Sequence, residues 1–326
     1  MEVDEAACIF ASLLLNSVFK FITLYWINKK RRSEPVCVGE ISSLYVYPVK
    51  SCAGIKVEEM DCTRHGSRTG AVTDRHWMIV DKNGKFLSQR KLPRLALVQP
   101  SITGNKLSLD APGMNTLKLD ILQPVNRDKI VKCSIWDVEV SAMSCGAEAD
   151  KWFSAFLQRP DTRLVCAHPD ITDCMRQLNK NLGTDPVLSY PKDQDVVAFA
   201  DWAPFMLLSE NSIADVNTRL SKKVEVRNFR PNFLVKDCGA YAEDSWHELY
   251  IGKETKFRNV RLGTRCTLTT VDPDKGEKDK DMEPLKTLRN YRLHPGCGDA
   301  PVFAINLVVD NVGKVCVGDK VFATMF

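Results

Sequence analysis

Residues 77–87, WMIVDKNGKFL, carry the clearest folding signal in the chain. Four apolar residues precede Asp81-Lys82-Asn83-Gly84, and the apolar pair Phe86-Leu87 follows soon after. An Asn-Gly pair between two apolar runs predicts a β-hairpin, because both residues tolerate the backbone conformations that a tight turn requires. The chain is therefore expected to be built on strands around this point.

Short strand-like segments continue on both sides of this hairpin. They cover residues 41–49, 106–109, 117–121, 138–140, 233–235, 249–251, 267–271, 302–309 and 315–322. Helical spacing is confined to residues 147–157, 212–220 and 283–291, and Ser212 with Asp215 resembles a capping box at the start of the second helix. Many short strands with few helices favour a mainly β, barrel-like body over a doubly wound parallel sheet.

The composition is that of a globular protein of about two domains. The 326 residues include 45 Lys and Arg against 41 Asp and Glu, a formal charge of +4, which is too balanced for a nucleic-acid-binding protein of this length. Hydrophobic residues make up 44% and charged residues 26%, as in folded domains. The polar stretch 171–192 predicts the seam between an N-terminal domain at 36–178 and a C-terminal domain at 179–326.

The 12 cysteines show no metal-binding spacing. No two of them are separated by only two residues, so the usual signatures of zinc ribbons, iron–sulfur quartets, thioredoxin-like motifs and haem attachment are absent. The chain is also long enough to bury a core without disulfides. We therefore expect most of the cysteines to be reduced and buried.

The N-terminus predicts a membrane anchor over residues 1–35. Residues 8–27 read CIFASLLLNSVFKFITLYWI, in which Lys20 is the one charged residue, and as a helix they would span about 30 Å, the thickness of a bilayer core. The basic stretch 28–32, NKKRR, follows and places the rest of the chain on the cytosolic side. A cleavable signal peptide would carry its basic residues before the apolar run, and a mitochondrial presequence would lack the acidic start.

Four segments place basic, amide or hydroxyl side chains near strand ends. They are YPVKS (47–51), DRHW (74–77), NFRPN (228–232) and TRCTLTTVD (264–272). Fixed Arg and Lys side chains beside amides and hydroxyls suit a polyanionic or heteroaromatic ligand, although solvated surface charges are the alternative for each segment alone. Cys266 adjoins Arg265, and a neighbouring cation favours the thiolate form that binds metals. From spacing alone, a buried inert cysteine is the alternative.

These segments together resemble the MOSC-domain molybdenum enzymes, and specifically the family of mitochondrial amidoxime-reducing components. The resemblance rests on YPVKSC (47–52), DRHW (74–77), NFRPN (228–232), YAEDSW (241–246), RCTLTTVDPDKG (265–276) and VGD (317–319). It extends from about residue 39 to the C-terminus. It implies a MOSC β-barrel preceded by a β-rich MOSC N-terminal domain and an N-terminal transmembrane helix.

The resemblance also implies the cofactor site. In the family, one protein cysteine ligates the molybdenum of the molybdopterin cofactor, and Cys266 occupies the matching position. The positions that hold the phosphate and pterin of the cofactor match Lys50, Ser51, Arg75, Arg230, Thr264 and Arg265. Trp202 and Ala203 replace a small hydroxyl pair of the family, which bears on substrate preference, and Asn306 stands where a tyrosine is expected.

The activity implied by the resemblance is the reduction of N-hydroxylated compounds such as amidoximes, N-hydroxyguanidines and hydroxylamines. Electrons would come from NADH through cytochrome b5 reductase and cytochrome b5, at the mitochondrial outer membrane, with the catalytic domain facing the cytosol. The alternative is a non-catalytic molybdenum-cofactor carrier or sulfur-handling MOSC module. A cysteine-nucleophile enzyme using His76 or His247 is a third alternative, which no nucleophile–base spacing supports.

Overall fold

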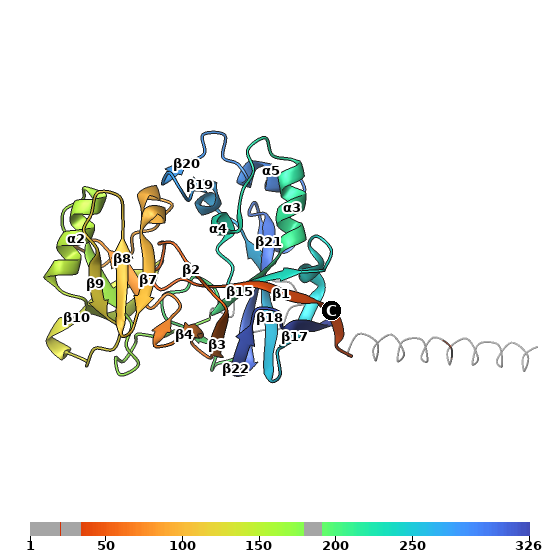
Figure 1. Cartoon of the computed structure of the whole chain (residues 1–326), viewed down its shortest axis with the longest axis horizontal. Helices are drawn as coiled ribbons and strands as arrows, with labels where there is room; N and C mark the ends of the chain where they lie inside the picture. Colours follow the sequence, from red (N-terminus) through yellow and green to blue (C-terminus); the bar gives the residue numbers. More distant parts are fainter. Residues whose placement is uncertain (1–19, 21–33, 179–190) are drawn as a thin grey trace, which may run out of the picture.

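A computed structural model describes residues 20, 34–178 and 191–326, and in them short strands predominate, with four α-helices (Figure 1). This confirms the mainly β class. The predicted membrane anchor lies outside the described residues apart from Lys20, Glu34 and Pro35. Within the described part of the chain, no helix combines the length and the apolar character that crossing a membrane requires.

Seven strands close into a barrel. Its order is β1-β16-β15-β21-β18-β17-β23, and β23 pairs again with β1. β1 therefore hydrogen-bonds to both edge strands, β16 and β23, of a sheet whose other strands come from the C-terminal part of the chain. The strands are β1 (Val36–Val46), β15 (Phe205–Ser209), β16 (Phe233–Lys236), β17 (Trp246–Ile251), β18 (Thr255–Thr264), β21 (Val302–Asn311) and β23 (Lys320–Met325).

Aromatic rings fill the barrel interior. The ring centroids of Phe205 and Phe233 are 5.7 Å apart, and each lies 5.3 Å from that of Phe257. All three side chains are buried and come from different strands. Packed aromatic pairs contribute about 0.5–1.5 kcal/mol beyond the burial of their area, so these contacts hold β15, β16 and β18 together.

A second lobe, residues 77–166, lies beside the barrel (Figure 1). The predicted hairpin is confirmed there: Val80 forms an antiparallel bridge with Phe86, and Leu87 N donates to Ile79 O at 2.8 Å. The lobe contains a four-stranded sheet in the order β10-β11-β12-β6 and a three-stranded sheet, β7-β8-β9. Its elements are β6 (Trp77–Val80), β7 (Gln99–Thr103), β8 (Lys106–Asp110), β9 (Leu117–Asp120), β10 (Ile130–Ile135), β11 (Val138–Ser144), α2 (Ala147–Leu157) and β12 (Arg163–Cys166).

The remaining elements lie outside the barrel and the two sheets of the lobe. β22 pairs with β3 in the sheet β22-β3-β4-β5, while β2 pairs antiparallel with β1. The predicted boundary between residues 178 and 179 lies at the edge of the described residues and stays a prediction. These elements are β2 (Ile55–Val57), β3 (Glu59–Thr63), β4 (Gly66–Thr69), β5 (Val72–Thr73), β13 (Arg176–Gln177), β14 (Val196–Val197), α3 (Glu210–Thr218), α4 (Val226–Phe229), β19 (Val271–Asp272), β20 (Glu277–Lys278), α5 (Leu285–Arg289) and β22 (Gly313–Cys316).

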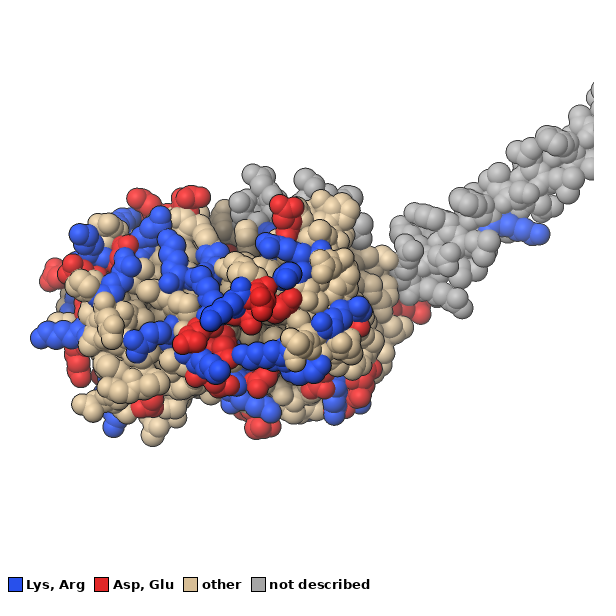
Figure 2. All heavy atoms as spheres, turned by 90° about the horizontal axis from the view of Figure 1, so that it is seen from above, with Lys and Arg blue, Asp and Glu red and all other residues tan. Residues whose placement is uncertain are grey.

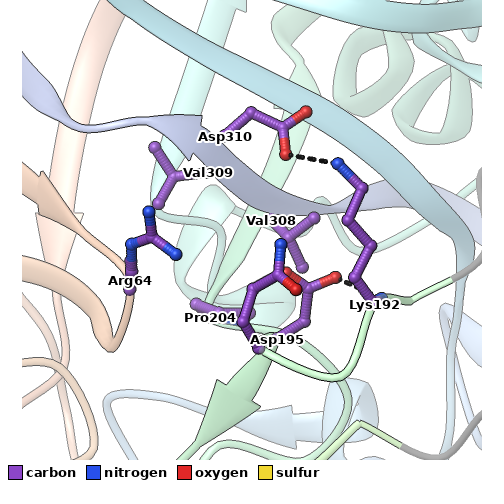
Figure 3. Close-up of a pocket in the computed structure, with 8 residues that line it drawn as sticks. Arg64, Lys192, Asp195, Pro204, Val308, Val309 and Asp310 are labelled. Atoms are coloured by element: carbon purple, nitrogen blue, oxygen red, sulfur yellow. Dashed lines mark hydrogen bonds and ion pairs between the residues drawn. The ribbon is translucent and has the colours of Figure 1, made fainter.

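A buried ion-pair network holds the segment after residue 190 against the barrel. Arg258 of β18 donates to Asp195 at 2.9 Å and to Asp310 at 2.8 Å. Lys192 Nζ lies 3.2 Å from Asp310 Oδ1, and its backbone N donates to Asp195 (Figure 3). The carboxylates around the small pocket of Figure 3 are thus already paired within the protein. Elsewhere on the surface, basic and acidic side chains are interspersed, as one face shows in Figure 2.

Three local predictions need correction. The strand predicted at 315–322 is interrupted at 317–319, between β22 and β23. α2 has the predicted bounds, but α3 begins at Glu210 and is capped by Ser209, whose Oγ accepts from Asn211 N at 3.2 Å. Ser212 is instead buried inside the helix. The predicted strand at 267–271 is wrong for its first four residues, which form the 3-10 helix η4 (Thr267–Thr270).

Ser212 contacts a buried carboxyl group, that of Glu243. Its Oγ donates to Glu243 Oε1 at 3.0 Å, and Ser209 N donates to the same oxygen at 3.1 Å. Glu243 Oε2 has no hydrogen-bond partner among the described residues. Burial raises the pKa of Glu243 to about 7. Since this pKa is raised in the folded state, the carboxyl group destabilises the fold increasingly as pH rises from about 4.5 to 7.

Glu243→Gln is therefore expected to stabilise the protein at pH 8 by about 3 kcal/mol, because the amide does not ionise. At pH 5 the gain is expected to shrink below about 1 kcal/mol, since Glu243 is then mostly protonated in the native protein. Urea unfolding of both proteins at the two pH values measures this difference. An equal effect at pH 5 and pH 8 would contradict the raised pKa.

Candidate active site

One cavity of about 550 Å³ lies where the barrel meets the second lobe. Phe86, Arg90 and Trp136 line it from the lobe, and Asn306 lines it from barrel strand β21. The structure brings every predicted site residue to this cavity: Lys50, Ser51, Arg75, Arg230, Thr264, Arg265 and Cys266. Their contacts with a cofactor stay a prediction.

Two asparagines position the segments that carry these residues. Asn228 Nδ2 donates to the carbonyl oxygens of Thr269 at 3.2 Å and Val271 at 3.1 Å, which connects α4 to η4. Asn232 Nδ2 donates to Tyr45 O at 3.1 Å and to Asp74 Oδ1 at 3.1 Å. The sequence patterns predicted that the two side-chain amides of NFRPN form part of a ligand site. Both amides instead donate hydrogen bonds to oxygen atoms of the protein.

Three of the cavity residues have a left-handed backbone conformation. Ser51, Arg75 and Arg230 have φ values of 73°, 49° and 61°. Such conformations are uncommon for residues with a Cβ, and they concentrate where a side chain must be held in one direction. The guanidinium groups of Arg75 and Arg230 both stack on Tyr47, each 4.4 Å from the ring centroid, and Arg230 also donates to Cys52 O.

Two of the cavity cations are paired with carboxylates. Lys50 Nζ lies 2.5 Å from Asp201 Oδ1 and donates to Phe199 O at 2.7 Å, and Arg75 pairs with Asp74. Burial lowers the pKa of Lys50, and Asp201 opposes that shift. Burial would raise the pKa of Asp201, but the Lys50 ammonium holds it below its usual value.

Arg230 and Arg265 differ from these cations. Each is only 8% exposed, and neither has a carboxylate within 4.0 Å among the described residues. Burial lowers the pKa of each to about 10. Arg265 donates to Phe229 O and Gly263 O, both at 3.2 Å. An uncompensated buried charge costs several kcal/mol, so this arrangement fits an anionic ligand that supplies the missing charge.

Cys266 presents the thiol of the cavity. It precedes η4, its carbonyl oxygen accepts from Thr269 N at 3.1 Å and Thr269 Oγ1 at 2.9 Å, and its residue is exposed. The eleven described cysteines are free, which agrees with the expected reduced state. Five of the eleven are buried, fewer than expected. Cys37 is the other exposed one in the described part of the chain.

Sequence patterns did not single out Arg90, Trp136 or Asp201 as site residues. Arg90 stacks over Trp136 at 4.2 Å, and Trp136 Nε1 donates to Asp201 Oδ1 at 3.2 Å. Trp202 also lines the cavity, beneath Arg261 at 4.0 Å. Trp136 and Trp202 are 40% and 39% exposed, so both can contact a ligand. Arg90 and Trp136 belong to none of the sequence motifs. Folding alone brings them to the cavity.

Comparison with known proteins identifies the family. Residues 38–160 match the MOSC N-terminal beta barrel domain, and residues 194–322 match the MOSC domain. The chain is 39% identical to the human protein named mitochondrial amidoxime-reducing component 1, over 91% of this chain and 86% of that protein. The chain belongs to the amidoxime-reducing component family of MOSC-domain proteins.

Other members of the amidoxime-reducing component family are similar over most of their length. The rat protein named mitochondrial amidoxime reducing component 2 is 40% identical, over 92% of this chain and 88% of that protein. The zebrafish protein named component 1 is 36% identical, over 96% of this chain and 91% of that protein. Both MOSC segments contribute to the cavity, Lys50, Arg75 and Trp136 from the first and Arg230 and Cys266 from the second.

Proposed function

We propose that this protein is a molybdenum-cofactor-dependent reductase of N-hydroxylated compounds, such as amidoximes, N-hydroxyguanidines and hydroxylamines. The overall reaction converts N–OH, two electrons and two protons into N–H and water. The observation that carries the proposal is the presence of two buried, uncompensated guanidinium groups, Arg230 and Arg265, in the same cavity as the exposed Cys266 thiol. The names of the relatives, amidoxime-reducing components, support the substrate class.

The residues present fit the cofactor. Arg230 and Arg265 supply the positive charge that its anionic phosphate and pterin oxygens need, and Arg75 adds further donors. Ser51 and Thr264 offer hydroxyl groups, and Cys266 offers a soft thiolate, the ligand type that suits a molybdenum–dithiolene centre. When bound, the cofactor supplies the two-electron chemistry that reduces the N–O bond.

The protein side chains bind and orient the substrate. Trp136 and Trp202 give the cavity two aromatic walls, each stacked by an arginine. The Asp201 carboxylate is held in place by its ion pair with Lys50 and by the hydrogen bond from Trp136. Asp201 can accept a hydrogen bond from an amidoxime NH₂ group and so direct the N–OH group inward.

Trp202→Ala is expected to raise the KM for benzamidoxime by about two- to tenfold, because an aromatic contact contributes about 0.5–1.5 kcal/mol. The KM for acetamidoxime, which has no ring, is expected to change less than twofold. Steady-state kinetics with both substrates measures the ratio. Equal changes for the two substrates would argue against an aromatic wall.

We propose that electrons arrive from NADH through cytochrome b5 reductase and cytochrome b5. Residues 1–35 would anchor the protein in the mitochondrial outer membrane with its catalytic domain in the cytosol, and the mitochondrial names of the relatives support that organelle. The apolar run and the basic stretch after it support the anchor. Membrane fractionation unchanged by deletion of residues 1–28 would overturn the anchor.

One assay tests the activity. The full chain is purified in detergent, its molybdenum and molybdopterin contents are measured, and NADH oxidation with benzamidoxime is followed in the presence of cytochrome b5 and its reductase. Turnover with stoichiometric molybdenum is the expected result. Bound cofactor without turnover of any N-hydroxylated compound would favour a cofactor carrier, and a protein that takes up no cofactor would overturn the proposal.

A further inference from the structure

A second cavity, of about 930 Å³, lies next to the first. Arg75 lines the first cavity, whereas the next two residues, His76 and Trp77, line the second. Much of its lining is apolar, but Cys166 and His168 also reach it. The proposed reductase activity uses none of these four groups.

Strands β6, β11 and β12 place Cys166 at this cavity, and Cys145 follows the end of β11. Cys166, the last residue of β12, pairs with Met143 of β11 on one side and with Trp77 of β6 on the other. Cys145 is two residues beyond Met143, and its N donates to Leu164 O at 2.9 Å. Because side chains alternate along a strand, Cys145 and Cys166 lie diagonally on one face of the sheet.

Two imidazole rings complete the cluster. His76 is joined to the end of β12 by a hydrogen bond from Ala167 N to His76 O at 2.8 Å. His168 follows two residues after Cys166, and its backbone N donates to Cys174 Sγ at 3.4 Å. A thiol with another thiol and two imidazole rings beside it is the arrangement that activates a cysteine.

The surrounding groups favour the thiolate of Cys166. The influence of Cys145, and then of His76 and His168, lowers the pKa of Cys166, although burial opposes this. The pKa of Cys145 is raised, so the shared proton stays there. The other titratable or charged groups near the cluster or along the cavity wall are His65, Arg68, Asp74, Asp120, Asp150, Asp170 and Cys174.

We propose that Cys166 is a covalent modification site for small apolar α,β-unsaturated carbonyl compounds that enter the second cavity. The Cys166 sulfur forms a bond to the β-carbon, the C=C electron pair shifts towards the carbonyl group, and the α-carbon takes a proton from water, which leaves as hydroxide. The product is a thioether, with no change in total electrons. Ile121, Met143 and Met175 in the lining can accommodate the alkyl part.

The test is the pH dependence of alkylation of the reduced full chain by cyclohexenone. Mass spectrometry of proteolytic peptides gives a rate for each cysteine. The Cys166 rate is expected to change by less than about tenfold between pH 6 and pH 8, because its pKa is lowered, whereas the rate of an unstructured cysteine peptide, with a pKa of about 8.5, should change by nearly a hundredfold.

Variants separate the cluster from a general effect of burial. Cys145→Ala removes the donor to Cys166 and should restore a steep pH dependence, while Cys133→Ala, a buried thiol of the same sheet, should not. If Cys145→Ala does not fold, His168→Asn provides the second variant, with a smaller shift in the same direction. A Cys166 that is unreactive in the folded protein, or that follows the pH dependence of the peptide, would overturn the proposal. The assay needs no molybdenum cofactor, so it stands apart from the reductase assay.

Discussion

Cys266→Ser is expected to lower benzamidoxime turnover by more than about a hundredfold, because loss of a metal ligand should exceed the 10–100-fold cost of losing an outer-shell partner. The exposed position predicts a change of less than about 0.5 kcal/mol in the free energy of unfolding. Steady-state kinetics and urea unfolding measure the two effects. The separation of activity from stability distinguishes a ligand from a structural cysteine.

The matched control is Cys37→Ser, because Cys37 is also exposed but lies at the start of β1, outside the cavity lining. It is expected to retain activity within about twofold. Full turnover by Cys266→Ser with unchanged molybdenum content would contradict the assignment of Cys266 as the molybdenum ligand, even if the protein proved to be a reductase.

Arg230→Gln is expected to reduce cofactor retention by about 10- to 150-fold, since hydrogen bonds to charged groups contribute about 1.5–3 kcal/mol. The cofactor-free protein should unfold at an equal or higher urea concentration than its parent, because the substitution removes a buried charge that lacks a carboxylate partner. Molybdopterin content after dialysis and urea unfolding of the cofactor-free form measure the two effects. Weaker cofactor retention together with unchanged or greater stability of the cofactor-free protein is what an anion-binding site predicts.

Arg227→Gln controls for the loss of one positive charge in the same segment of the chain. Arg227 lies within α4, whereas Arg230 directly follows its last residue, and the Arg227 guanidinium pairs with Glu225 and Asp274 near the surface. Its substitution is expected to leave cofactor content unchanged. Equal loss of cofactor in both variants would point to general electrostatics or to a disturbed α4 instead of a specific contact.

Local signals predicted local structure well. The hairpin at residues 77–87 and the helix α2 depend on turn residues and apolar spacing within a dozen positions, and both are confirmed. The segment 267–271 was misassigned because its β-branched residues resemble a strand. The hydroxyls of Thr269 and Thr270 bond to the carbonyls of Cys266 and Thr267 instead, and such local bonds compete with sheet pairing.

The residue types of the sequence by themselves predicted the mainly β class, and the resemblance of its motifs to a known family implied the family and seven of the residues that line the cavity. Only the tertiary structure decided that β1 closes the barrel with β16, that Lys50 is paired with Asp201, and that Arg230 and Arg265 lack such a partner. It also placed Cys166 beside Cys145 and His76. The reason is physical: the charge state of a buried group depends on the partners that folding brings next to it, and one of these, Asp201 beside Lys50, lies 151 residues away along the chain.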